Sequence, residues 1–462
     1  MQSQPSTPWE SLAEFVQQLM KQHQVPGVAL GILHQGQIST AGFGLTNVEH
    51  PLPVTESTLF QIGSITKTFV GTAIMRLAES DHLNLDATVR TYIPDFRVAD
   101  EVASASATVR HLLTHTGCWA GDFFHATGPG DDALARYVAD MADLPQLAPL
   151  GSQWSYNNAG FSVAGHIIER VTGQTFEAAL QELVLEPLGL ARSFLVPGDV
   201  MTHRFAAGHD QSDDGPQVAR PWPLERSSRP QGGLVCDVND LLRYARFHLG
   251  DGRTENGKML LSPDSLAQMQ APQVQVWGNA AWGLTWRTEE IAGTRQISHG
   301  GGTRGQITLL VLVPERELAL AVLTNGSQGG LVTDAVRRWI LQEYLDMDDV
   351  KPEAIQTPDG ELAQYAGYYR GFFNDAELGM LGGKLVGQIT YKRGFPGEQV
   401  PPRPAPPPMS IGLCETDRLL VLDGRAKDTL GDIIRKPDGT IGWLRFGGRL
   451  HTREEAARQK SC

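Results

Sequence analysis

The chain lacks most of the features that mark secreted, membrane-spanning or metal-binding proteins. Among its 462 residues are only four cysteines, and the spacing of Cys118, Cys236, Cys414 and Cys462 fits neither a disulfide framework nor a zinc site. No apolar run reaches the length of a transmembrane helix. Residues 1–6 have neither a basic start nor an apolar segment, so we expect no signal peptide and a cytoplasmic protein.

The sequence also has fewer basic than acidic residues. The sequence has 39 Lys and Arg against 52 Asp and Glu, and this net charge of -13 argues against binding to nucleic acid or to anionic membrane surfaces. A hydrophobic content of 41% with regular patterning indicates a globular protein. The 50 glycines and 28 prolines suit a loop-rich α/β protein better than a helical bundle.

One short segment combines a nucleophile with a base. Ser64-Ile65-Thr66-Lys67 begins a run with helical apolar spacing, and residues three apart on a helix share one face. The Lys67 amine can therefore lie beside the Ser64 hydroxyl. Gly63 allows a tight entry and leaves room for a ligand, while unpaired N–H groups of the first turn favour negative charge nearby. This combination fits acyl transfer through a serine, with lysine replacing the more usual histidine.

Ser-x-x-Lys alone is a weak signal, but two further clusters follow it. In Tyr156-Asn157-Asn158, the tyrosine hydroxyl can relay a proton and an asparagine amide can hold a substrate carbonyl. His299 precedes Gly300, Gly301 and Gly302 at the end of a strand-like run. Glycines in a strand mark a close approach of another backbone or of a ligand, and these would leave edge N–H groups free for a substrate.

The three clusters, in this order, resemble the serine β-lactamase and penicillin-binding-protein family. The nearest resemblance is to class C β-lactamase-related hydrolases, namely esterases, D-aminopeptidases and DD-peptidases. Supporting segments are Val25–Leu30, Arg110–Gly117 and Gly232–Leu234, and the resemblance spans residues 9 to about 346. It implies an α/β (α+β) fold, in which helices and a helical subdomain flank an antiparallel sheet.

The resemblance also implies a role for each matching residue. Ser64 would be the acylated nucleophile, Lys67 its general base and Tyr156 the proton shuttle. Asn158 would orient the substrate, and the backbone N–H of Gly302 would complete an oxyanion hole with that of Ser64. His299, Gly300 and Gly301 would contact the substrate along the strand.

His299 departs from the Lys-Thr-Gly pattern of the β-lactamases. A lysine there is a permanent cation that helps to hold a carboxylate, whereas histidine near neutral pH is mostly uncharged. The histidine form occurs in relatives that cut esters or amino-terminal D-residues. If His299 contacts the substrate, activity should follow a group that titrates near pH 6–7. Arg304, just beyond the glycines, is either the missing cation or a solvated loop residue.

We therefore expect a serine hydrolase that cleaves ester or amide bonds of small molecules or short peptides through a Ser64 acyl-enzyme, without a metal or cofactor. A β-lactamase and a non-hydrolytic penicillin-binding sensor are the alternatives.

The apolar patterns predict a hydrolase domain at 9–346, a linker at 347–361 and an antiparallel β-barrel or sandwich at 362–455. Within the first domain we expect helices at 9–22 and 331–346, and strands at 27–33, 37–44, 281–287, 294–299, 306–313 and 317–324. A helical insert at about 80–230 lies between them, and the nucleophile should sit at the junction. In some relatives such a β domain walls the cleft or mediates a homo-oligomer.

Three weaker candidates lie close together. His111 and His115 have the spacing of a zinc-binding helix, but Leu112 replaces the usual glutamate and structural roles are favoured. The loop with Trp119, Phe123 and Phe124 either lines an acyl pocket or pins itself to the body of the protein. Cys118 has no basic neighbour in sequence that would activate its thiol.

Overall fold

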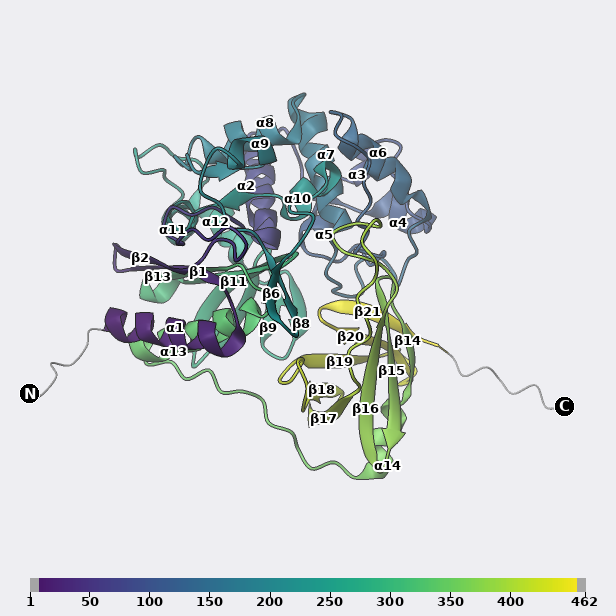
Figure 1. Cartoon of the computed structure of the whole chain (residues 1–462). Helices are drawn as coiled ribbons and strands as arrows, with labels where there is room; N and C mark the ends of the chain where they lie inside the picture. Colours follow the sequence, from purple (N-terminus) through teal and green to yellow (C-terminus); the bar gives the residue numbers. More distant parts are fainter. Residues whose placement is uncertain (1–7, 455–462) are drawn as a thin grey trace, which may run out of the picture.

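A computed structural model describes residues 8–454, so Cys462 and residue 455 lie outside the described range. The predicted fold class is confirmed: an antiparallel sheet flanked by helices is followed by a closed β-barrel (Figure 1). The sheet has eight strands in the order β2-β1-β13-β12-β11-β10-β9-β8. Their bounds are β1 Gly27–His34, β2 Gln37–Gly44, β8 Val274–Trp277, β9 Ala280–Trp282, β10 Arg287–Ile291, β11 Thr294–Thr303, β12 Gln306–Val313 and β13 Leu318–Thr324.

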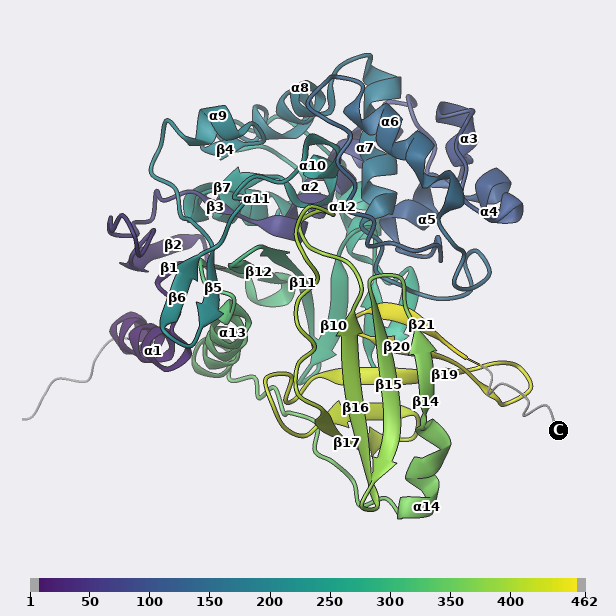
Figure 2. The ribbon, with the colours of Figure 1, turned by 45° about the vertical axis from the view of Figure 1, so that its right-hand side comes forward.

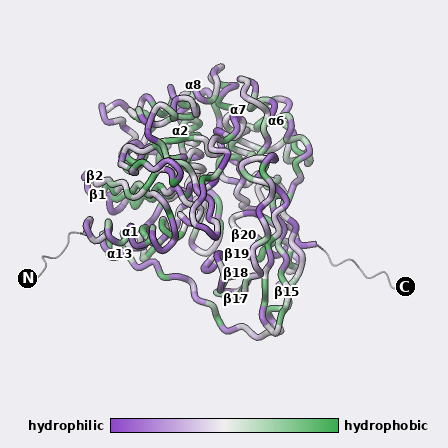
Figure 3. The backbone as a smooth tube through the Cα atoms, in the orientation of Figure 1, coloured by the Kyte–Doolittle hydropathy of each residue, from purple (hydrophilic) through white to green (hydrophobic). Residues whose placement is uncertain are grey.

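Helices cover both faces of this sheet. The first and last helices of the domain, α1 (Pro8–His23) and α13 (Gly329–Leu345), pack together on one face, and α11 (Val238–Leu249) packs on the other (Figure 1). Every residue of β13 is buried, as expected for a strand with apolar layers above and below. Figure 3 shows hydrophobic stretches along the strands of this sheet and in the central helices.

One predicted strand is wrong. The run 281–287 is a hairpin rather than a strand, because β9 ends at Trp282 and β10 begins at Arg287. The turn between them is closed by a hydrogen bond from Gly283 N to Trp286 O at 2.7 Å, and Thr285 has a left-handed φ of 75°. Alternation of side chains, on which the prediction rested, does not reveal a turn made of apolar residues.

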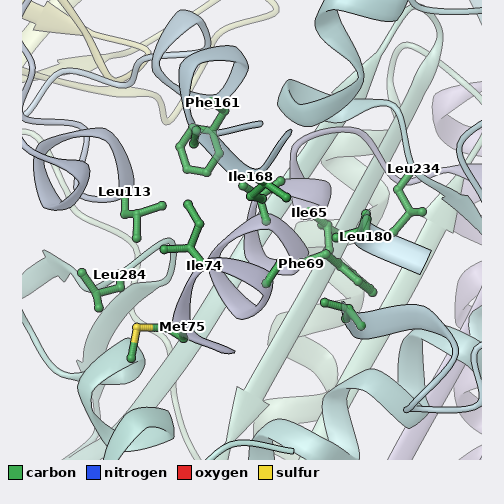
Figure 4. Close-up of a cluster of buried hydrophobic side chains, with 14 of the residues drawn as sticks. Ile65, Phe69, Ile74, Met75, Leu113, Phe161, Ile168, Leu180, Leu234 and Leu284 are labelled. Carbon is green, nitrogen blue, oxygen red and sulfur yellow. The ribbon is translucent and has the colours of Figure 1, made fainter. Parts of the chain in front are cut away.

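The helical region lies beside the sheet and surrounds α2 (Thr66–Glu79). Figure 4 shows Phe69 and Ile74 of α2 within a buried cluster that includes Phe161 and Leu180. Such burial stabilises the fold by about 1.5–3 kcal/mol for each large apolar side chain. The other helices here are α3 Val89–Tyr92, α4 Glu101–Ser106, α5 Val109–Leu113, α6 Ala133–Asp140, α7 Ala159–Thr172, α8 Phe176–Leu180, α9 Pro197–Val200, α10 Arg229–Gly232 and α12 Pro263–Gln270. Short strands complete it: β3 Phe60–Gln61, β4 Ser193–Phe194, β5 His209–Ser212, β6 Gly215–Val218 and β7 Val235–Cys236.

After an extended connection and the short helix α14 (Asp359–Leu362), the chain closes into an eight-stranded barrel. Its strands are β14 Gly367–Arg370, β15 Asn374–Leu381, β16 Lys384–Tyr391, β17 Met409–Glu415, β18 Arg418–Val421, β19 Leu430–Arg435, β20 Ile441–Phe446 and β21 Arg449–Arg453. Figure 2 shows loops at one end of the barrel reaching up to the helical region. The barrel is bonded to that region, since Trp443 Nε1 donates to Leu147 O at 2.8 Å and Leu450 N donates to Ser155 Oγ at 3.2 Å.

Candidate active site

Ser64 lies in a 3₁₀ turn, Gly63–Ile65, that leads directly into α2. Lys67, in the first turn of α2, places Nζ 2.9 Å from Ser64 Oγ. Gly63 has a φ of 54°, and a Cβ at this position would lie 2.5 Å from the backbone N of Gly302. A glycine is therefore required here, because the turn that carries Ser64 packs backbone to backbone against β11.

Lys67 is completely buried, although lysine is rarely found in a protein interior. Its Nζ donates a hydrogen bond to the main-chain carbonyl of Gln231 on α10. Burial lowers the pKa of Lys67 well below its usual value; the positive charge of Arg449 lowers it further, and Asp122 opposes this. Burial thus favours the neutral form of an amine that lies next to a serine hydroxyl.

Tyr156 is the third group at this point. Burial raises the pKa of its phenol, so the ring stays neutral. The Lys67 Nζ lies 5.1 Å from the centroid of its ring. Within the described chain the Tyr156 hydroxyl is buried without a hydrogen-bond partner, as expected of a group that awaits one from a substrate.

Asn158, two residues further on, also lines the site. Its Nδ2 donates to Asp122 Oδ1 at 2.6 Å, which turns the amide group toward the same wall. The intervening Asn157 is structural: its backbone N donates to His115 Nδ1 at 3.0 Å. His111 joins a capping box with Thr108, so both histidines of the weak zinc motif have structural partners.

The glycines of β11 approach a backbone, as their position in a strand indicated. A Cβ on Gly301 would lie 1.8 Å from the carbonyl oxygen of Ile62, whereas one on Gly300 would have its nearest neighbour at 3.8 Å. The pairing of β10 with β11 stops at Ser298, so residues 299–303 have a ladder partner only on the β12 side. Gly300 and Gly302 are exposed at this edge.

His299 is buried at the same edge and is a neutral group. Burial lowers the pKa of His299 to about 3; a proton on Lys67 would lower it further, and a hydrogen bond to the Gly300 carbonyl opposes the shift. Its Nδ1 lies 2.6 Å from that carbonyl and therefore carries the proton, which leaves Nε2 as an acceptor. The expectation of a histidine that titrates near pH 6–7 is wrong for this environment.

Arg304 does not reach the site. Its side chain forms an ion pair with Asp210 at 3.0 Å and donates to the carbonyl of Arg220, so it is neither the missing cation nor a freely solvated residue. A cation that does line the site is Arg449 of β21. Its guanidinium lies 4.7 Å from the centroid of the Tyr156 ring and pairs with Asp122 at 3.0 Å.

The barrel positions this arginine through main-chain contacts. Gly448 O accepts a hydrogen bond from Tyr156 N at 2.8 Å, immediately next to Arg449. Sequence analysis missed Arg449, Asp122 and Gln231, because none of them belongs to a local motif and they meet only in the folded protein.

These residues surround one cavity of about 690 Å³ that is open on one side. The hydrolase domain contributes Ser64, the wall formed by Tyr156 and Asn158, and the β11 glycines; the barrel contributes Phe373, Tyr391, Arg393, Phe395, Arg403 and Arg449. The question left open by the sequence is thereby answered: the C-terminal barrel walls the cleft.

The three aromatic residues of the loop before α6 have different roles: two fix the loop to the rest of the protein and one lines the cavity. Trp119 is buried and packs on Phe96, with ring centroids 5.8 Å apart, and Phe123 packs on Tyr137 at 5.2 Å, so both pin the loop. Phe124 lines the cavity. Cys118 is buried with a raised pKa and donates weakly to carbonyl oxygens, which is typical of an inert structural thiol.

No helix in residues 8–454 combines the length and apolar character needed to cross a membrane. Over the same residues, we find no group of three potential metal ligands among the His, Cys, Asp and Glu side chains.

Two named proteins are similar in sequence to a large part of this chain. Penicillin-binding protein 4 of Amycolatopsis lactamdurans is 35% identical over 360 residues, which are 76% of this chain and 94% of that protein. Esterase EstB of Burkholderia gladioli is 33% identical over 219 residues, or 44% of this chain and 55% of the esterase.

Solved structures match the barrel as well as the hydrolase domain. A crystal structure of SurE with D-Leu aligns with a TM-score of 0.76 at 25% identity, covering 97% of this chain and 99% of SurE. An octameric penicillin-binding protein homologue from Pyrococcus abyssi aligns with a TM-score of 0.61 at 23% identity, covering 97% and 100%, which shows a shared fold. The family model described as Beta-lactamase matches residues 12–343, and the chain belongs to the beta-lactamase family.

Proposed function

We propose that this protein is a serine hydrolase that cleaves ester or amide bonds of small substrates through an acyl-enzyme on Ser64. The observation that carries the proposal is the buried, neutral Lys67 amine 2.9 Å from Ser64 Oγ. A neutral amine can accept the hydroxyl proton as the oxygen attacks a carbonyl carbon. Such a base typically contributes about 10²–10⁴ in rate.

Acylation then needs a donor for the leaving group and a site for the oxyanion. Tyr156, with its proton retained by a raised pKa, can protonate the leaving group and recover a proton from Lys67. The backbone N–H groups of Ser64 and Gly302 are the proposed oxyanion donors, and the close packing of Gly63 on Gly302 brings these two segments together. One such donor is worth about 2.7–4 kcal/mol in the transition state.

Substrate orientation is assigned to Asn158 and to the β11 edge. The Asn158 amide can bind a substrate carbonyl, while His299 Nε2 can accept from a substrate N–H or O–H. Gly300 leaves the strand edge open to an extended substrate, and the backbone of Gly301 lines the same cavity. Water then attacks the acyl-enzyme with the same Lys67 and Tyr156 pair as proton carriers.

The substrate class has support from the relatives named above. Esterase and penicillin-binding protein are names of similar proteins, and SurE has been crystallised with D-Leu. A small ester or a short peptide is therefore the first candidate. A β-lactamase is the second, because Arg449 supplies a positive charge where His299 supplies none.

Initial rates on a p-nitrophenyl short-chain ester, a D-alanyl anilide and a chromogenic cephalosporin test this proposal. Wild type and Ser64→Ala are compared, and the variant should lose all turnover while its melting temperature stays nearly unchanged. Turnover that survives Ser64→Ala contradicts the mechanism. A stable adduct with a penicillin, without turnover of any substrate, would support a binding sensor instead.

We further propose that residues 9–346 form the catalytic unit and 362–455 an accessory domain, and that the protein acts in the cytoplasm. The free thiols of Cys118, Cys236 and Cys414 support a reducing compartment. A homo-oligomer is supported only by the octameric relative, and its mass in solution would test it.

A further inference from the structure

The part of the cavity that faces the barrel is lined by aromatic rings from separate segments. Phe124 belongs to the helical region, whereas Phe373 precedes β15 and Phe395 lies on the loop between β16 and β17. Phe124 meets Phe373 at 5.9 Å and Phe395 at 4.8 Å between ring centroids, with both pairs edge to face. Figure 2 shows the barrel loops extending to the helical region at this end of the molecule.

These three rings are only half-buried, although they pack on one another. Rings that served solely to join the two domains would be covered by them, as Trp154 is where Arg445 of the barrel packs on it. Instead, their remaining surface borders the same cavity as Ser64. A bound apolar group would cover that surface, with a gain of about 25 cal/mol for each Å² removed from water.

The rim of this region carries positive charge. Arg393 and Arg403 line the cavity from the barrel loop, and neither makes an ion pair with any residue that the structure describes. Asp122 is the one acidic residue in the described lining, and Arg449 neutralises it. In a chain with a net charge of -13, two unpaired arginines beside an aromatic wall indicate selection of an anionic group.

We propose that this region is a substrate subsite formed by both domains, which takes an aromatic side chain of the acyl portion together with a carboxylate at its far end. The aromatic group lies among Phe124, Phe373 and Phe395, and the carboxylate faces Arg393 and Arg403. We assign the acyl portion because it stays bonded to Ser64 through both half-reactions and needs an enclosed space, whereas the leaving group needs a path out. This inference rests on the proposed hydrolase function.

Four p-nitrophenyl esters test the subsite: those of N-acetyl-alanine, N-acetyl-phenylalanine, N-succinyl-alanine and N-succinyl-phenylalanine, in both configurations. Rates with Ser64→Ala are subtracted. We expect kcat/KM for the preferred phenylalanine ester to exceed that of its alanine counterpart about tenfold or more. The succinyl esters should exceed the acetyl esters severalfold, and this preference should shrink in about 1 M NaCl.

Variants of the cavity lining test which residues cause the preference for phenylalanine over alanine esters and the preference for succinyl over acetyl esters. Phe395→Ala should reduce the phenylalanine-to-alanine ratio toward one, and the double variant Arg393→Gln/Arg403→Gln should remove the succinyl preference. Two matched controls change residues outside the cavity lining. Phe15→Ala removes a half-buried ring of α1 that stacks on Trp339 of α13, and Arg425→Gln removes an arginine from an exposed barrel loop. Both controls should keep the wild-type ratios.

The possible outcomes distinguish a failure of the proposed subsite from a failure of the proposed hydrolase function. Serine-dependent turnover with a phenylalanine-to-alanine ratio below about twofold, or a ratio unchanged in Phe395→Ala, overturns the aromatic subsite but leaves the hydrolase in place. Equal rates on succinyl and acetyl esters overturn the anion-binding part. Absence of Ser64-dependent turnover on all four esters and on p-nitrophenyl acetate counts against the proposed function itself.

Discussion

Replacement of Arg449 by methionine should shift the pH dependence of the enzyme. Arg449 is one of the groups that keep Lys67 neutral, and methionine retains much of its length without the charge. Loss of the cation raises the pKa of Lys67, so a smaller fraction of the amine is free to act as a base at a given pH. The acidic limb of the kcat/KM profile should therefore move to higher pH.

The size of the shift follows from the geometry. The Tyr156 ring centroid lies 5.1 Å from Lys67 Nζ and 4.7 Å from the Arg449 guanidinium. The two cations are thus at most ~10 Å apart, and at an effective dielectric constant of about 20 their repulsion is at least about 1.7 kcal/mol. Because the Arg449 side chain is 38% exposed, solvent weakens this interaction, and we expect a shift of about half a unit to one unit.

The assay is kcat/KM from about pH 5 to 10 with a p-nitrophenyl ester, followed at the isosbestic wavelength of the product. Arg449→Lys retains the charge and should keep the wild-type limb. Arg445→Met is the matched control for loosening of the barrel, since Arg445 is a buried arginine of the same interface that pairs with Asp432. An acidic limb that stays in place in Arg449→Met, with the protein folded, would refute the electrostatic reasoning; the same shift in Arg445→Met would assign it to barrel docking.

Three further predictions follow from the site. Tyr156→Phe should slow acylation by about 10² or more in single-turnover experiments, and a rate within about twofold of wild type would remove the tyrosine from proton transfer. His299→Gln should lower kcat/KM without changing the shape of the profile between about pH 5 and 8, because the pKa of His299 is about 3 and its charge is constant there; a wild-type limb near pH 6–7 that vanishes in the variant would contradict this. Gly301→Ala should destabilise the protein by about 1–3 kcal/mol in thermal unfolding, because its Cβ would lie 1.8 Å from the Ile62 carbonyl oxygen, whereas Gly300→Ala, with 3.8 Å of clearance, should leave the melting temperature nearly unchanged. Equal losses in the two glycine variants would show that close packing is not the cause.

Sequence alone was sufficient for groups that meet within a helical turn or along one strand. Ser64 and Lys67 are three residues apart, and the β11 glycines are consecutive, so local geometry fixed their arrangement. The protonation state of His299 could not be predicted in this way. It depends on burial, which arises only when β11 packs against the turn that carries Ser64.

The same limit explains the choice of the wrong arginine. Arg304 is close to the glycines in sequence, but it lies on the turn after β11 and forms an ion pair with Asp210. Arg449 lies almost 300 residues after Tyr156 in the sequence. It reaches the site because the neighbouring Gly448 of the barrel accepts a hydrogen bond from the backbone N–H of Tyr156. A cation near a motif in sequence is thus weak support for a cation near it in space.

Family membership describes the first domain of this protein but not the barrel. The match to the beta-lactamase family covers residues 12–343, which include Ser64, Lys67, Tyr156 and the β11 edge, but it leaves the barrel outside. In the proposed mechanism, those residues determine how a carbonyl is attacked. The barrel supplies rings and arginines to the lining of the cavity, and the family match does not include this wall. The substrate must therefore be sought through the barrel face of the cavity, where Phe395, Arg403 and their neighbours meet the helical region.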